Sequence, residues 1–236
     1  MKKYILLSLV LSYFNIVDLS AQKNNQLNSW WTYSGNHKVA QKISLHTLYS
    51  FRRSNFVADW QQSLLRIGIN YHYSDKLIFT PGYDWVVIFP YGEQPIGKET
   101  TEQRIYEQIV LKNTVGRLGI VHRYHLEQRF SNNTVQHRFR YRLTTKIPLG
   151  KNETNKQHLF LSIFDEVFVN LGEQPTGHYF DQNWFYVGLG YPFKNGLTIK
   201  MGYMNQYLVK FDNRHIENNH TPQFALSYDL DFPKRT

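Results

Sequence analysis

Charged side chains recur at every second position in the segment T-V-Q-H-R-F-R-Y-R-L-T-T-K-I-P-L, residues 134–149. Arg138, Arg140 and Arg142 alternate there with apolar and aromatic side chains. A β-strand turns successive side chains to opposite faces, whereas a helix would distribute these charges around its whole surface. The segment is therefore predicted to be a strand with one basic face and one apolar face.

The same two-residue period recurs through most of the chain and is separated by turn-forming residues. Further strands are predicted at residues 42–52, 65–73, 77–89, 104–112, 118–130, 159–170, 185–191, 197–203 and 224–232. The alternation is ambiguous at 104–112 and irregular at 159–170. We expect an all-β fold, an antiparallel up-and-down transmembrane β-barrel of about ten strands. A short segment at residues 29–35 (S-W-W-T-Y-S-G) would be an eleventh strand, but an antiparallel barrel needs an even number of strands. Twelve strands are therefore the alternative.

The first residues have the pattern of an export signal. Lys2 and Lys3 precede an apolar run at residues 4–14, and the small residues Ser20 and Ala21 follow it. A basic N-terminal region, a short apolar core and small residues at the cleavage site are typical of a signal peptide. The run is too short for a membrane-spanning helix, which needs about 20 apolar residues. We predict a signal peptide at residues 1–21 and one barrel domain at residues 22–236.

Composition agrees with a barrel that has a lipid-facing outside and a wet inside. The mean hydropathy of −0.49 is too polar for a helical membrane protein, yet 16% of the residues are aromatic. Membrane barrels combine an apolar outer band, aromatic rims and a polar lumen. The chain has no cysteine, which excludes disulfides and thiolate metal sites. The net charge of +9 is compatible with anionic partners, but export argues against nucleic acid.

Charge density indicates which face points outward. The charges lie in rows on one face of the predicted strands, and the other face has almost none. A soluble periplasmic barrel with the inverse arrangement would bury rows of arginines in an apolar interior, which is costly without partners. We therefore place the apolar face in outer-membrane lipid and expect the barrel-assembly machinery as a partner during insertion. The predicted lumenal polar cluster contains Arg66, Asp84, Arg117, Arg123, His125, Glu127, Arg129, Arg138, Arg140, Arg142, Lys146 and Asp229.

The connections are predicted to differ in length at the two ends of the barrel, as in outer-membrane proteins. Long links are expected at residues 90–101, 171–181 and 211–219, and short ones at 74–76, 113–116 and 192–196. The link at 150–157 is longer than a periplasmic turn should be. A repeat of G-E-Q-P-x-G at residues 92–97 and 172–177 falls in two of the long links. The repeat indicates either that both links form the same kind of Pro/Gly turn or that the two loops together contact one ligand outside the cell.

Several ordered segments resemble a known family. They are W-W-T-Y-S-G-N-H near the start, G-R-L-G-I-V-H-R-Y-H-L-E-Q-R-F at 116–130, R-F-R-Y-R-L at 138–143, F-D-Q-N-W-F-Y-V-G-L-G-Y at 180–191, G-Y-M-N-Q-Y at 202–207 and E-N-N-H-T at 217–221. Together they resemble the exported barrel family of unknown function DUF2490 over nearly the whole mature chain. This resemblance implies an outer-membrane β-barrel in a Gram-negative bacterium, and it supplies no catalytic residue.

Three roles remain open from the residues themselves. The first is a structural or binding barrel whose lumen is filled by salt bridges, and the second is a narrow anion-preferring pore. The third is a lipid-modifying enzyme with His125 and Asp84 as first candidates, although no serine partner is identifiable. His122 and His125 would lie on opposite faces of a strand, so they do not predict a metal site. No cofactor is expected.

Overall fold

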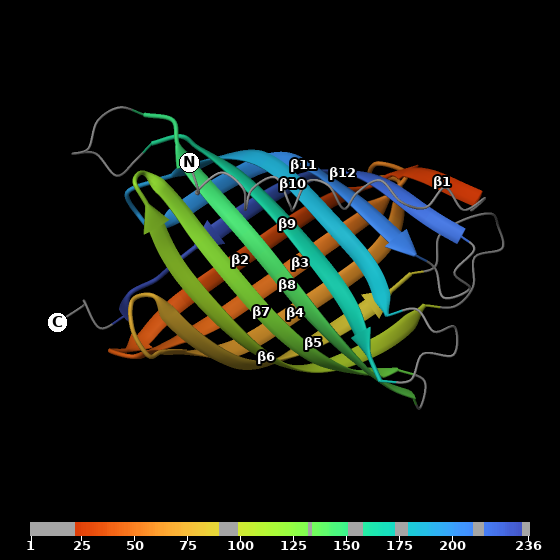
Figure 1. The fold of residues 1–236 in the computed structure, drawn as a ribbon, viewed down its shortest axis with the longest axis horizontal. Coiled ribbons are helices and arrows are strands. Elements are labelled where there is room, and N and C mark those ends of the chain that lie inside the picture. Colours follow the sequence, from red (N-terminus) through yellow and green to blue (C-terminus); the bar gives the residue numbers. More distant parts are fainter. Residues whose placement is uncertain are drawn as a thin grey trace, which may run out of the picture.

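The structure, a computed structural model, describes residues 22–89, 99–131, 134–150, 158–172, 179–209 and 215–232. It is an all-β fold in which every element of the described chain long enough to name is a strand (Figure 1). The strands are β1 (Gln22–Leu27), β2 (Ser29–Ala40), β3 (Ile43–Ser54), β4 (Asp59–His72), β5 (Leu77–Ile88), β6 (Thr100–Val115), β7 (Leu118–Ser131), β8 (Thr134–Pro148), β9 (Phe160–Leu171), β10 (Phe180–Pro192), β11 (Leu197–Val209) and β12 (His215–Tyr228). The predicted signal peptide at residues 1–21 lies outside the described residues.

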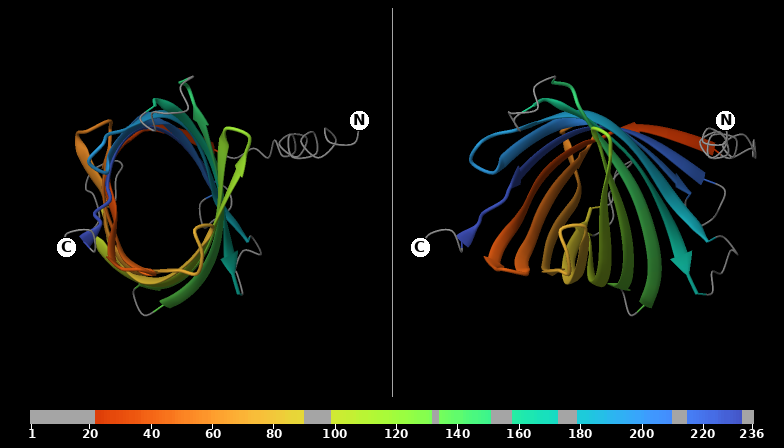
Figure 2. Two further views of the ribbon diagram at one scale, coloured as in Figure 1. Left: turned by 90° about the vertical axis from the view of Figure 1, so that its left-hand side faces the viewer. Right: turned by 60° about the vertical axis from the view of Figure 1, so that its left-hand side comes forward.

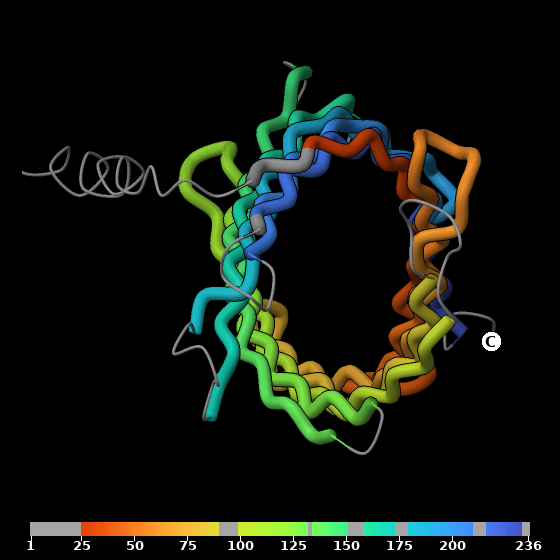
Figure 3. The backbone as a smooth tube through the Cα atoms, turned by 90° about the vertical axis from the view of Figure 1, so that its right-hand side faces the viewer, coloured from red at the N-terminus to blue at the C-terminus, as the bar shows by residue number. Residues whose placement is uncertain are grey.

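The strands form a closed barrel. From β2 to β12 each strand pairs antiparallel with its neighbour in the sequence, and β12 then pairs with β2 in parallel. Seen along the barrel, the ring of strands is continuous and oval in outline (Figures 2 and 3). The predicted all-β barrel of about ten strands is confirmed: among the described residues eleven strands close the ring, and β1 lies outside it as a twelfth.

The strand that breaks the expected parity is the first one. β1 and β2 follow β12 in one unbroken register, from Gln22 opposite His215 to Ser34 opposite Ser227. Asn28, between them, donates its backbone N–H to the carbonyl of His220 at 2.9 Å. The predicted short segment at residues 29–35 is thus the start of a full strand. A purely antiparallel ring needs an even number of strands, and the parallel β12–β2 seam removes that requirement.

The last strand begins earlier and ends earlier than predicted. β12 starts at His215, so the link expected at residues 211–219 is confined to residues 210–214. The outward positions Asn218 and His220 are polar because they hydrogen-bond to the neighbouring strand β11. Polar residues on both faces conceal the two-residue period in this half of β12, which explains the error.

The connections gather at two rims. The C-terminal rim carries the end of β12 and the β2–β3, β4–β5, β6–β7, β8–β9 and β10–β11 connections, and the N-terminal rim carries the start of β1 and the other five. The links predicted to be long at residues 90–101 and 171–181 join strands at the N-terminal rim. The links predicted to be short, and the exceptional link at 150–157, join strands at the C-terminal rim. Residues 92–97 and 173–177 of the repeated motif lie outside the described residues.

The outer face is apolar around the whole ring. In β4, Leu65, Ile67 and Ile69 are exposed, whereas Arg66 between them is buried. Every strand from β2 to β12 contributes exposed large hydrophobic side chains in this way. Most side chains that face inward are charged, polar or aromatic, with a few aliphatic ones such as Leu64, Val86 and Met204, and most of the exposed hydrophobic surface is on the outside.

Tyr106 lies flat against the inner wall because two glycines leave room for it. Gly68, Gly82 and Tyr106 are neighbours across β4, β5 and β6. A Cβ atom at Gly82 would clash with the Tyr106 ring, and one at Gly68 would clash with the Tyr106 hydroxyl. The buried phenol in turn lies beneath the Arg66 guanidinium, 4.5 Å from ring centroid to Cζ.

We expect Gly82→Ala to destabilise the barrel by about 1–3 kcal/mol, because the ring of Tyr106 must shift in a packed interior. Denaturant unfolding in detergent micelles measures this. Gly119→Ala is the matched control, since its Cβ would meet the nearest side chain, Lys146, at an ordinary 3.7 Å. Equal stability of the two variants would contradict the proposed packing of Tyr106.

Candidate functional site

The inner wall brings most of the predicted charges together. Arg66 on β4 and Asp84 on β5 are direct cross-strand partners. Their guanidinium and carboxylate form a bidentate pair, with Nε–Oδ1 at 2.7 Å and Nη2–Oδ2 at 2.6 Å. Both side chains are buried. This planar two-bond geometry is the strongest form of an arginine–carboxylate interaction.

Glu127 on β7 is the first of two carboxylates that each form ion pairs with several arginines. Its oxygens accept hydrogen bonds from Arg138 and Arg140, both at 2.8 Å, and Arg104 lies at 3.4 Å. The side chain has no exposed surface. A buried carboxylate is tolerable only when its charge and lone pairs are satisfied, and these arginines satisfy both.

Glu166 on β9 is the second such carboxylate. Arg140 donates to it at 2.8 Å and Arg123 at 2.5 Å, and Arg142 forms a further ion pair. Glu166 is also completely buried. Arg140 contacts both Glu127 and Glu166, so it joins the two carboxylate centres into one network.

The network continues toward the N-terminal rim. Glu102 on β6 pairs with Arg104 and, at 2.7 Å, with Arg129. Asp181 pairs with Arg138 at 2.7 Å. We call the whole set the ionic network. It consists of Arg66, Asp84, Glu102, Arg104, Arg123, Glu127, Arg129, Arg138, Arg140, Arg142, Glu166 and Asp181.

Two predicted members lie elsewhere. Arg117 is exposed in the β6–β7 turn and hydrogen-bonds to the carbonyl of Gly150. Asp229 follows the end of β12, is exposed, and accepts a hydrogen bond from the backbone N–H of Asn36 at 2.8 Å. Their placement in the cluster was wrong, because Arg117 precedes the start of β7 and Asp229 follows the end of β12.

His125 and Lys146 face inward with different surroundings. His125 is buried, with Nδ1 3.3 Å from Gln108 Oε1 and Nε2 3.5 Å from Glu127. Lys146 is near the C-terminal rim and remains exposed, with its ammonium 5.6 Å from the ring of Phe160. Solvent therefore reaches the inner wall near the C-terminal end of β8, whereas the wall around His125 is buried.

Four charged residues of the ionic network were not predicted from the sequence, and the sequence carries a signal for only some of them. Glu102 and Arg104 were hidden because Glu107 faces outward on the same strand, where Gln128 bonds to it. Asp181 lies at an irregularity in the β9–β10 register, where alternation fails. Asp165 and Glu166 are adjacent carboxylates on β9, and only one of them can face inward. Glu166 takes that position, and Asp165 binds Asn183 on the other face.

The remaining part of the inner wall is aromatic. The buried cluster of Trp30, Phe164, Phe168, Trp184, Tyr186 and Met204 projects inward from β2 and from β9 to β11. Arginines of β8 lie over it, with Arg140 at 4.3 Å from the ring centroid of Phe168 and Arg142 at 4.0 Å from that of Phe164. Guanidinium groups are attracted to the faces of aromatic rings. The lumen thus has an ionic side and an aromatic side, and the arginines of β8 bind both.

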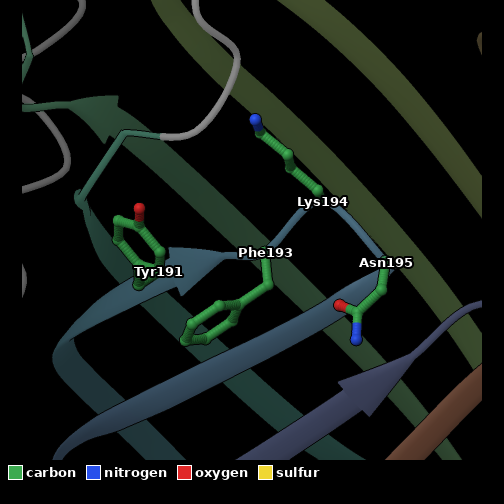
Figure 4. A pocket seen from close by; sticks show the side chains of 4 residues that line it. All are labelled: Tyr191, Phe193, Lys194 and Asn195. Carbon is green, nitrogen blue, oxygen red and sulfur yellow. The ribbon is translucent and has the colours of Figure 1, made fainter.

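A pocket of about 300 Å³ lies away from this network, at the β10–β11 turn (Figure 4). It is lined by Tyr191, Phe193, Lys194 and Asn195, with the rings of Tyr191 and Phe193 edge to face. This lining is typical of a barrel rim and provides neither a nucleophile nor a pair of acidic and basic groups.

The candidate catalytic pair does not form a reacting unit. Both oxygens of Asp84 are held by Arg66, whereas His125 bonds to Gln108 through Nδ1 and its Nε2 has no hydrogen-bond partner among the described residues. Within the described residues no group of three or more His, Asp and Glu side chains could hold a metal ion. Within the same residues no helix is long and apolar enough to cross a membrane.

Fold and interior together define a closed, mostly antiparallel β-barrel with a salt-bridged core of charges and an apolar exterior. The chain matches the family described as a protein of unknown function (DUF2490) over residues 27–217, and it belongs to that family. The resemblance inferred from the sequence motifs is confirmed. No curated protein and no solved structure matches the chain.

Proposed function

We propose that this protein is an integral barrel of a Gram-negative outer membrane, with a lumen plugged by the ionic network. In this role it is a structural or binding barrel and does not conduct ions. The observation that carries the proposal is the distribution of side chains in the closed ring. Large apolar side chains are exposed on the outside of every strand from β2 to β12, and most of the charged residues of the strands gather inside.

Aromatic side chains at both rims support the membrane assignment. Phe51, Trp60 and Phe89 contact one another at the N-terminal rim. Tyr191 and Phe193 are paired at the C-terminal rim. Aromatic belts of this kind mark the two membrane–water interfaces of transmembrane barrels. Lipid is then the main partner of the outer face, and we propose that insertion uses the barrel-assembly machinery.

The density of ion pairs supports a plug. Glu127 and Glu166 have no exposed surface, and each is surrounded by at least three arginines from neighbouring strands. An open path along this wall would leave these carboxylates in contact with water. The alternative, an anion-preferring pore, is favoured by the excess of inward cations over carboxylates, which includes Lys146 and Arg52.

Fractionation tests the location. We expect the mature chain in the outer-membrane fraction, and we expect it to migrate faster on a denaturing gel when it has not been boiled. A closed barrel resists detergent unfolding at room temperature, whereas boiling opens it. Recovery from the soluble periplasm would contradict the proposal, as would an unboiled sample that migrates at the same position as the boiled one.

Planar-bilayer recording tests the plug. We expect no conductance steps from the wild type, and steps from a variant with Arg138, Arg140 and Arg142 all replaced by glutamine, because unpaired carboxylates draw water into the lumen. Arg53→Gln is the control, since Arg53 faces outward and binds the carbonyls of Val57 and Ala58. Regular anion-selective steps from the wild type would instead establish the pore.

A further inference from the structure

One inward cation does not belong to the ionic network. Arg52 on β3 is the cross-strand partner of Trp30 on β2, and its guanidinium carbon lies 3.7 Å from the centroid of the Trp30 ring. Its Nε donates weakly to Ser50 Oγ at 3.4 Å. Among the described residues no carboxylate lies within ion-pair distance of Arg52, in contrast to all seven arginines of the ionic network.

The surroundings of Arg52 increase the need for a counter-charge. Arg66, Arg104, Arg138 and Arg140 all repel it. Their own charges are neutralised by carboxylates that make no contact with Arg52. A cation held inside a barrel without a partner is unfavourable, and an anion bound to it removes that penalty.

The site is rigid and offers more than one donor. Stacking on Trp30 fixes the plane of the guanidinium, and Trp184 stands edge-on to Trp30 at 4.9 Å. The indole N–H of Trp30 donates to Gln61 Oε1 at 3.1 Å. That bond uses the amide oxygen of Gln61, so its –NH₂ remains a donor next to the indole on which Arg52 stacks.

We propose that Arg52, with the amide of Gln61, forms an oxyanion-binding site inside the barrel near the N-terminal rim. The ligand class is a carboxylate or a phosphate, because two oxygens on one atom match the planar fork of a guanidinium. Chloride, which has one centre and no such geometry, is the reference ion. The site is a property of the folded barrel and does not require the proposed membrane location.

Thermal unfolding of the full-length protein in detergent micelles without phosphate headgroups tests the site. Inorganic phosphate and acetate are each titrated against chloride at constant ionic strength. A ligand that binds the native state raises the melting temperature in proportion to the logarithm of its concentration once it exceeds the dissociation constant. We expect such a rise for the wild type with at least one of the two oxyanions, and the stronger response identifies the class.

Arg52→Gln should abolish the rise, and in chloride alone this variant should melt at the same temperature as the wild type or higher. The second effect follows because the substitution removes a repelled cation. Arg53→Gln, the outward neighbour, should keep the full response. Arg52→Lys should retain only part of it, since it keeps the charge but loses the fork.

Tryptophan fluorescence provides a measurement that does not depend on the stability of the variants. Phosphate or acetate should change the emission of the wild type, and Trp30→Phe should remove that change. The proposal is overturned if the wild type responds to neither oxyanion beyond chloride, if Arg52→Gln still responds, or if Arg53→Gln loses the response equally. Heat-modifiable migration of the same samples reports separately on the barrel itself.

Discussion

Glu166→Gln is expected to lower the free energy of unfolding by about 3–5 kcal/mol, because it leaves three arginines in the lumen without their common carboxylate. Glu166 is fully buried, and Arg123, Arg140 and Arg142 all contact it. Urea unfolding of the protein reconstituted in lipid vesicles, followed by tryptophan fluorescence, measures the change.

Glu107→Gln is the control for the same chemical change on the outer face. Glu107 is exposed and has a weak contact with Gln128 at 3.4 Å. Its replacement should leave the stability nearly unchanged or raise it. If both variants lost the same free energy, Glu166 would not have the central role that its contacts indicate.

Tyr141→Arg is expected to destabilise the barrel by about 2–4 kcal/mol in a bilayer, because it places a charge near the middle of a strand on the side that we propose faces lipid. Tyr141 is central in β8, faces outward and contacts Tyr124 and His122 there. The measurement is the folding free energy in lipid vesicles compared with that in detergent micelles.

His137→Arg is the depth control, since His137 faces outward on the same strand but close to its start at Thr134. The penalty for arginine falls to about 0–1 kcal/mol near the interface. A penalty that is the same at both positions, or larger at His137, would show that this face is not in lipid.

The two-residue period was sufficient to predict the fold class, because it reports the direction of each side chain. Leu65, Ile67 and Ile69 face outward as the alternation requires, and Arg66 faces inward. The period does not report which strands pair, or in which direction. The parallel seam between β12 and β2 depends on contacts between residues far apart in the sequence, so the strand number could not be derived from local alternation.

The inward arginines were easier to predict from the sequence than the carboxylates that pair with them. Arginines such as Arg138 and Arg140 stand in rows on one strand, which makes their common face visible. The carboxylates that neutralise them are distributed singly over several strands, and Glu102 and Glu166 each have a polar or acidic neighbour that obscures the alternation. Arg117 and Asp229 were misplaced for a related reason: alternation in the sequence extends beyond the strand itself, before the start of β7 for Arg117 and past the end of β12 for Asp229.

The odd number of strands in the ring has a consequence for how the two ends of the described chain are presented. The chain enters the barrel at Gln22 on the N-terminal rim and leaves β12 at the C-terminal rim. In an even-stranded barrel both ends emerge on the same side, and the strands can be inserted as complete hairpins. Here five hairpins account for β3 to β12, and the segment of β1 and β2 crosses alone. For a barrel in a membrane, this lone crossing puts the two ends in different compartments, so that reporters fused to them would read opposite sides of one bilayer.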